Sequence, residues 1–221
     1  MVQTTVFIYS MIENIIIFVS FIFSIFYIKK IRNNKTLKDF PIYTLISIIV
    51  DLIWYFKRSV GILSVNLFII FEFIVFYRFY WKVLNTSKDH SILIKLISLY
   101  IVLFSIMTWL YYKKYHLLGI SLFSRHIFIE TIAMSNIMLV IPPILYYKSL
   151  FSVSIKNFSK EPQFLIMSGI LFGFILTIPI DTMYLLIRHH DKNLFSQLYV
   201  LNALGYIIMH LLIIKSYLAL K

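Results

Sequence analysis

The sequence of 221 residues contains no cysteine and only nine acidic residues. Without cysteine, the protein can have neither a disulfide framework nor thiolate chemistry nor a Cys-ligated zinc site. Charged residues make up 14% of the chain and hydrophobic residues 61%, whereas an average soluble domain is about a quarter charged. A water-soluble core of this size cannot hide so much apolar surface. We therefore expect most of that surface to face lipid.

Common enzyme motifs are also missing from the chain. The sequence has no HExxH, no GxSxG, no Gly-rich phosphate loop and no aspartate-rich metal motif. We therefore expect no catalytic residue, no cofactor and no metal site, and we do not expect an enzyme.

The net charge is +12, but the basic residues lie in short loops between apolar stretches. This distribution is typical of membrane topology and anionic headgroups, and it argues against nucleic acid as a partner. Too few residues lie outside the apolar stretches to build a second domain in water. We therefore expect residues 1–221 to form a single transmembrane domain.

Seven apolar stretches run through the chain, and most are long enough to cross ~30 Å of hydrocarbon as helices. They cover residues 6–27, 41–56, 62–82, 92–112, 127–147, 164–187 and 198–218. This pattern predicts an all-α fold, a polytopic membrane protein built as a seven-transmembrane-helix bundle. Short similarities between the first three and last three stretches, such as NLFII and QLYVL, fit a 3+1+3 internal repeat with the fourth helix as linker. Chance similarity is the alternative.

The positive charge is unevenly distributed over the two sides of the predicted bundle. Fourteen of the 21 Lys and Arg residues fall in the first, third and fifth loops and at the C-terminal end. Because basic loops resist translocation, this count predicts a cytoplasmic C-terminus and an N-terminus outside. No basic residue precedes the first stretch, so we do not expect a cleaved signal peptide.

Four acidic residues lie within the outer half or near the midplane of the predicted spans: Glu13, Asp51, Glu130 and Asp181. An ionisable group at membrane depth costs ~2.5 kcal/mol or more and usually faces the bundle interior. The four acids could line an outward-opening cavity for a cation, a proton or a basic ligand. Alternatively, each acid reaches water by snorkelling or is protonated in a bond between helices.

Glu72 and His210 fall near the midplane of the third and seventh stretches, and Asn202 adds a neutral polar group. Glu72 and His210 could form a buried ion pair or share a proton, which would make helix packing sensitive to pH. A structural hydrogen bond between the two helices is the alternative. We treat all three residues as candidates for a ligand or ion pathway.

Three prolines lie inside predicted helices: Pro142, Pro143 and Pro179. Proline removes a backbone donor and kinks a helix, which frees carbonyl groups and can create a hinge. A fixed bend without any hinge motion is the alternative reading of each.

Several segments resemble an uncharacterised family of small bacterial seven-helix integral membrane proteins. These segments are NLFIIFEFIVFYRFY, FIETIAMSNIMLVIPPILYYKSLF, PQFLIMSGILFGF and LYVLNALGYIIMHLLIIKSYLAL. In that family the sixth helix tends to begin Pro-x-Phe-Trp, and a His-Asn pair often lies early in the seventh. Here Leu165 replaces the Trp, and only Asn202 of the pair is kept. The resemblance implies the bacterial inner membrane and, because members are often encoded near sensor histidine kinases, a signalling partner.

The dipeptide at Pro162 and Gln163 is also similar to the PQ-loop of small seven-helix transporters, although those carry it in both repeats. Three functions therefore stay open. The leading expectation is a membrane sensor or signalling module without catalysis, in which buried polar groups bias a helix rearrangement. The alternatives are a transporter or channel for a small solute or ion, and a structural subunit of a membrane complex. Expected partners are the lipid bilayer, a membrane or cytoplasmic signalling protein, and a second copy of the chain.

The odd number of predicted spans leads to a test of topology. Reporter enzymes that are active on only one side of the membrane should show the two chain ends on opposite sides, with the C-terminal fusion cytoplasmic. Two ends on the same side would contradict the predicted span count.

Overall fold

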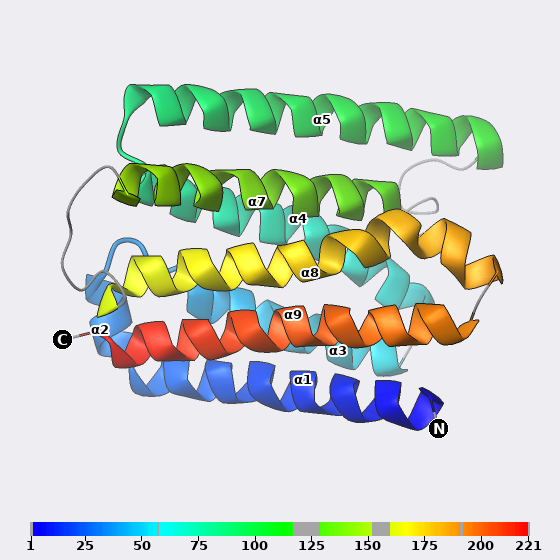
Figure 1. The fold of residues 1–221 in the computed structure, drawn as a ribbon, viewed down its shortest axis with the longest axis horizontal. Coiled ribbons are helices and arrows are strands. Elements are labelled where there is room, and N and C mark those ends of the chain that lie inside the picture. Colours follow the sequence, from blue (N-terminus) through cyan, green and yellow to red (C-terminus); the bar gives the residue numbers. More distant parts are fainter. Residues whose placement is uncertain (1, 57, 117–128, 152–159, 191, 221) are drawn as a thin grey trace.

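The computed structural model describes residues 2–56, 58–116, 129–151, 160–190 and 192–220, which form helices and no strand. The helices are α1 (Val2–Phe26), α2 (Ile28–Asn33), α3 (Phe40–Phe56), α4 (Arg58–Val83), α5 (Ser87–Tyr115), α7 (Ile129–Phe151), α8 (Pro162–His190) and α9 (Lys192–Leu218). Apart from the short α2, they run along the long axis of the molecule (Figure 1). The predicted all-α fold is confirmed for these residues.

Five of the described helices are long and apolar enough to cross a membrane. Their apolar segments are Phe7–Phe26, Val60–Val83, Ser87–Tyr115, Pro162–Ile180 and Leu198–Leu218, and α3 is a shorter apolar helix of 17 residues. Only 11% of the apolar part of α5 and 17% of that of α1 is buried inside the protein. Helices with such apolar outer surfaces are what a multi-pass membrane protein places in lipid.

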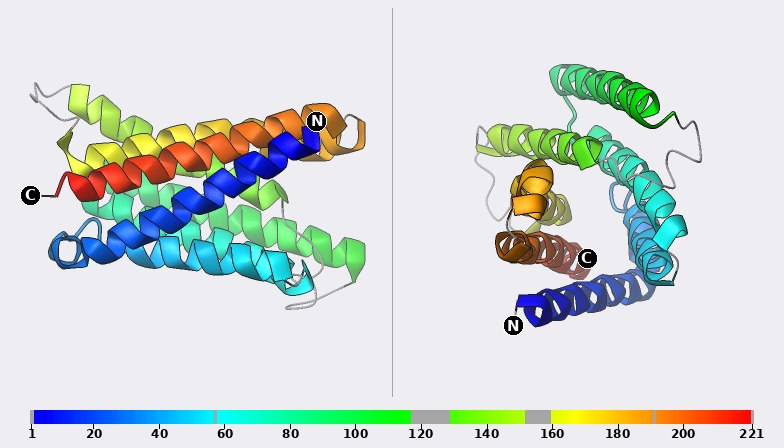
Figure 2. Two further views of the ribbon diagram at one scale, coloured as in Figure 1. Left: turned by 90° about the horizontal axis from the view of Figure 1, so that it is seen from below. Right: turned by 90° about the vertical axis from the view of Figure 1, so that its right-hand side faces the viewer.

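Six of the described helices form a closed ring in which each one contacts the next, in the order α1, α3, α4, α7, α8, α9 and back to α1. The end-on view in Figure 2 shows this ring, with α5 outside it. Helix α5 contacts α7 and, more weakly, α4. Helices α1, α3 and α4 form one half of the ring, and α7, α8 and α9 form the other half.

The packed core lies at the end of the bundle where α9 ends, which we call the C-terminal end. Its centre is a group of buried aromatic side chains that we call the aromatic core: Phe40, Tyr43, Phe76, Phe79, Tyr80 and Phe174. Several of these rings meet edge to face, which is a favourable aromatic geometry, for example Phe40 and Phe79 with centroids 5.3 Å apart. At the same end, Asp39 accepts a charged hydrogen bond from Lys82 at 2.5 Å. These contacts close the C-terminal end.

Helices α8 and α9 form the most extensive interface in the bundle, and they approach closely at three glycines. Gly169 and Gly173 of α8 face Gly205 and Met209 of α9. Lipid tails are as apolar as core side chains, so the hydrophobic effect does not drive helices together inside a bilayer. Small residues let the two backbones come close enough for extensive van der Waals contact. The spacing of Gly169 and Gly173 is the GxxxG pattern that favours this packing.

This close approach predicts the effect of a single methyl group. In Gly205→Ala the new Cβ would lie 2.6 Å from the backbone carbonyl oxygen of Gly173, so the helices would have to separate. We expect a loss of about 1–3 kcal/mol of stability, measured as a lower thermal unfolding midpoint in detergent. In the matched control Gly173→Ala, the Cβ would meet the side chain of Met209 at 3.2 Å, and the loss should be smaller. Equal midpoints for the two variants would contradict the close contact between Gly205 and Gly173.

Candidate functional site

A cavity of about 480 Å³ opens between α1, α3 and α9, toward the N-terminal end of the bundle where α1 begins. Its lining consists of Ser10, Glu13, Asn14, Phe18, Ile48, Asp51, Leu52, Trp54, Tyr55 and Tyr199. Small-molecule sites in proteins typically have volumes of roughly 300–1,000 Å³. The cavity is therefore large enough to hold a small organic molecule.

Helical periodicity explains why these residues share one cavity. On α1, Glu13 and Asn14 follow Ser10 by three and four residues, which places all three on one face. On α3, Asp51 and Tyr55 are four residues apart and therefore also share a face. Each helix turns one polar face toward the other, and the cavity forms between the two faces.

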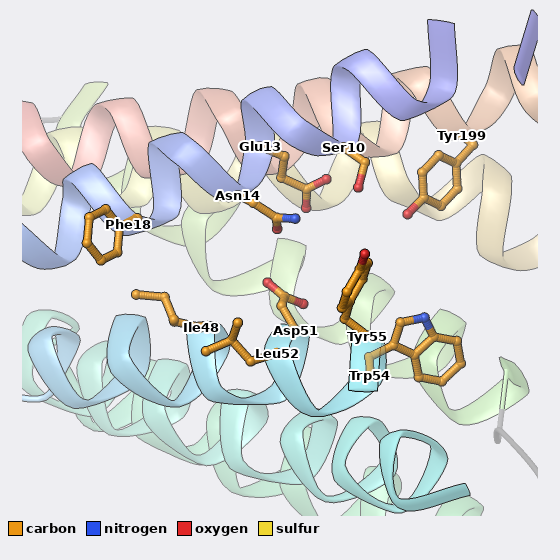
Figure 3. A pocket seen from close by; sticks show the side chains of 10 residues that line it. All are labelled: Ser10, Glu13, Asn14, Phe18, Ile48, Asp51, Leu52, Trp54, Tyr55 and Tyr199. Carbon is orange, nitrogen blue, oxygen red and sulfur yellow. The ribbon is translucent and has the colours of Figure 1, made fainter. Parts of the chain in front are cut away.

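The two carboxyl groups of the cavity lie at a similar depth. Glu13 is six residues from the start of the apolar segment of α1, and Asp51 is five residues from the end of α3. At 1.5 Å per residue, Glu13 lies roughly 9 Å from the start of that apolar segment, and Asp51 lies roughly 8 Å from the end of α3. Figure 3 shows the two carboxyl groups facing each other across the gap between α1 and α3. None of the ten lining residues is basic, so the cavity favours a cation.

A second group of polar side chains lies in the aromatic core, at Tyr43, Glu72 and His210. The hydroxyl of Tyr43 donates a hydrogen bond to Oε1 of Glu72 at 2.8 Å. The ring of Tyr43 also stacks on the imidazole of His210, with centroids 6.0 Å apart and planes 8° from parallel. His210 is fully buried, and neither of its ring nitrogens has a hydrogen-bond partner within the described part of the chain.

The predicted pairing of Glu72 with His210 is therefore corrected, because neither an ion pair nor a hydrogen bond joins them. Tyr43, from the beginning of α3, contacts both residues instead. Its long side chain brings a hydroxyl to Glu72 and an aromatic face to His210. The pairing prediction considered only two helices, and a third helix supplies the partner.

The remaining predicted residues lie apart from one another. Glu130 accepts a hydrogen bond of 2.8 Å from the hydroxyl of Tyr111, so it lies between α7 and α5 and not in the lining of the cavity. Asn202 follows Tyr199 by three residues on α9, and its Oδ1 has no hydrogen-bond partner among the described residues. Asp181 belongs to α8, but its side chain lies outside what the structure describes. The structure thus brings Glu13 and Asp51 together and separates Glu130 from them.

The two adjacent prolines lie inside α7, which continues through both. The carbonyl of Leu139 would normally accept a hydrogen bond from residue 143, or from residue 142 in a tighter turn, and both are prolines without an N–H group. The hydroxyl of Tyr80 on α4 donates to this carbonyl at 2.7 Å. A buried hydrogen bond therefore ties the proline pair to α4. Pro179 lies in the second half of α8. Figure 1 shows that α8 changes direction along its length.

Sequence reasoning did not single out Tyr43, Tyr80 or Tyr199 as polar contributors. A signal for Tyr199 was present, because Tyr199, Asn202, Tyr206 and His210 recur along α9 at spacings of three and four residues. Such spacing marks one polar face of an otherwise apolar helix. Tyr43 and Tyr80 had no comparable signal, because tyrosine is common throughout this chain, which has 16 of them.

Comparisons with protein-family models, with curated proteins and with solved structures found no match to this chain. Within residues that the structure describes, no three or more His, Cys, Asp or Glu residues gather as they would around a metal ion. The feature with the clearest chemistry is the cavity that contains Glu13 and Asp51.

The bond from Tyr80 leads to a stability prediction with a built-in control. Tyr80→Phe leaves the carbonyl of Leu139 buried without its donor, which should cost about 1–3 kcal/mol. Tyr77→Phe removes a buried hydroxyl that has no hydrogen-bond partner in the described chain, so it should be neutral or stabilising. Thermal unfolding of the two variants in detergent measures the difference. A loss of stability in Tyr77→Phe equal to that in Tyr80→Phe would mean that the hydroxyl of Tyr80 is not specifically required.

Proposed function

We propose that this chain is a membrane carrier that takes up a small cationic solute from outside, with Glu13 and Asp51 as the binding carboxylates. The observation that carries the proposal is the cavity between α1, α3 and α9, whose lining has these two acids and no basic residue. Two carboxylates in one partly apolar cavity repel each other, and a bound cation relieves that repulsion. The cavity therefore selects its ligand first by charge.

The proposed topology has seven spans, formed by α1, α3, α4, α5, α7, α8 and α9, with the N-terminus outside. The excess of basic residues on the opposite side supports this orientation. The layout of the ring also supports an internal duplication. The contact between α4 and α7 joins the halves at one side, the contact between α9 and α1 joins them at the other, and α5 stays outside as the linker.

Transporters built from repeats bind their substrates at the interface between the repeats. The cavity fits this rule, because α1 and α3 belong to the first half of the ring and α9 belongs to the second. The cavity lies toward the N-terminal end of the bundle, whereas the aromatic core fills the other end. This arrangement supports an outward-facing state of the proposed carrier. Movement of one half against the other would open the aromatic core to the cytoplasm.

A signalling module is the second candidate function, and one observation favours it. The cavity lining includes no residue of the aromatic core, so the ligand site ends before the closed end of the bundle. A blind site of this kind suits a receptor that binds a ligand without moving it. Four expectations stay predictions: the location in the bacterial inner membrane, the kinase partner implied by the family resemblance, the role as a structural subunit, and the homo-oligomer.

The experiment that tests the carrier is flux into proteoliposomes containing the purified protein. Wild-type protein should move a cationic solute down its gradient and produce a measurable current. The double variant of Glu13→Gln and Asp51→Asn should lower the initial rate at subsaturating solute by at least roughly tenfold, because the charge-assisted contacts are lost. Glu130→Gln is the matched control, since its carboxyl group lies outside the cavity lining and the rate should stay near that of wild type.

Two outcomes would contradict the carrier. Saturable binding of the solute without any flux would favour the signalling candidate. Equal loss of flux in Glu130→Gln and in the double variant would mean that the cavity acids have no special role.

A further inference from the structure

The cavity is divided into zones of different chemistry along its length (Figure 3). One end, which we call the apolar end, is formed by the side chains of Phe18, Ile48 and Leu52, and the middle by Glu13, Asn14 and Asp51. The other end, toward the N-terminal end of the bundle, is formed by Ser10, Trp54, Tyr55 and Tyr199, and we call it the mouth. A ligand that fills the cavity therefore meets an apolar surface, then two carboxyl groups, then aromatic rings.

The size of the cavity does not match a bare inorganic ion. A bound Ca²⁺ or Mg²⁺ is surrounded closely by about six to eight oxygen atoms. A single water molecule takes up about 30 Å³ of liquid, many times less than the cavity volume of about 480 Å³. An inorganic ion would leave the apolar end of the cavity without contacts. A ligand with both a charge and a carbon body would use the whole lining.

The aromatic side chains of the lining also favour an organic cation. The face of a Trp or Tyr ring attracts a cation through its quadrupole, and sites for quaternary ammonium groups use several such rings. Trp54 and Tyr55 come from the end of α3, and Tyr199 extends from α9 on the opposite side with its hydroxyl directed into the cavity (Figure 3). The mouth therefore has aromatic groups on two sides.

We propose that the solute is an organic ammonium ion with a small apolar body. The ammonium group lies between Glu13 and Asp51, and the body packs against Phe18, Ile48 and Leu52. Asn14 offers its amide oxygen as a further acceptor, and the rings at the mouth cover the bound cation. This inference rests on the proposed function, because it names the chemical class of the solute that the same cavity takes.

Trp54 provides a direct reporter of binding. The chain has three tryptophans, and the other two lie outside the lining of the cavity, Trp81 stacked on His90 and Trp109 beneath the ammonium group of Lys113. When Trp81 and Trp109 are replaced with Phe, Trp54 is the only tryptophan that remains, and all tryptophan fluorescence comes from the cavity. Purified protein in detergent is then titrated with methylammonium, butylammonium and benzylammonium, with their neutral analogue benzyl alcohol, and with Na⁺, K⁺ and Mg²⁺.

We expect a saturable change in fluorescence with the alkyl and aryl amines, and tighter binding of benzylammonium than of methylammonium because of its apolar body. Benzyl alcohol and the inorganic ions should bind at least roughly tenfold more weakly than benzylammonium. Glu13→Gln and Asp51→Asn should each weaken benzylammonium binding by a similar factor.

Tyr199 separates the role of the ring from that of apolar bulk. Tyr199→Phe keeps an aromatic face and should keep most of the affinity, whereas Tyr199→Leu keeps an apolar side chain without that face. The Leu variant should bind benzylammonium roughly 2- to 30-fold more weakly than the Phe variant, the range expected for a cation–π contact. Equal affinities would overturn the role of the aromatic mouth.

The outcomes distinguish the solute class from the carrier function. If Na⁺, K⁺ or Mg²⁺ binds in the cavity and none of the amines does, the organic class is wrong and a carrier of inorganic cations stands. If benzyl alcohol binds as tightly as benzylammonium, the carboxyl groups do not select charge, and the organic ammonium assignment is overturned. If no cation binds and the proteoliposomes show no flux, both the solute class and the carrier are wrong.

Discussion

A polar group inside the hydrocarbon of a bilayer has no water to bind, so it must find its partner within the protein. Several bonds between helices follow from this constraint, among them Tyr43 to Glu72, Tyr80 to the carbonyl of Leu139, and Asn136 to Thr177. Each joins two different helices of the ring. Because lipid tails are as apolar as the buried side chains, such bonds and close packing hold the ring together, and hydrophobic burial contributes little.

The two ends of the bundle meet this constraint in different ways. At the C-terminal end, Glu72 is enclosed by the aromatic core and receives the hydroxyl of Tyr43. At the N-terminal end, Glu13 and Asp51 face an open cavity through which water or a ligand can reach them. His210 is an exception, because it is fully buried without a hydrogen-bond partner for its ring nitrogens in the described residues. Its stacking on Tyr43 offsets only part of the cost of removing it from water.

The difference between the ends gives the carrier proposal its physical basis. An open acidic cavity attracts a cation, and a closed core prevents that cation from leaking through. The cavity lies at the meeting of α1 and α3 with α9, so a ligand bound there contacts both halves of the ring. If the two halves move relative to each other, the contacts of the ligand differ between the two conformations. That difference is what allows a ligand to change the balance between them. The same reasoning applies to a receptor, in which the conformational change itself is the output.

The sequence alone determined the features that depend on local pattern. Apolar length and composition predicted helices and a lipid-facing surface, and the scarcity of acids made Glu13, Asp51 and Glu72 stand out. Only the tertiary structure decided which of those residues meet: Glu13 with Asp51 in the cavity, Glu130 with Tyr111, and Tyr43 in contact with both Glu72 and His210. The physical reason is that helical periodicity fixes the face on which a side chain lies. The helix that this face meets is set by the packing of the whole ring.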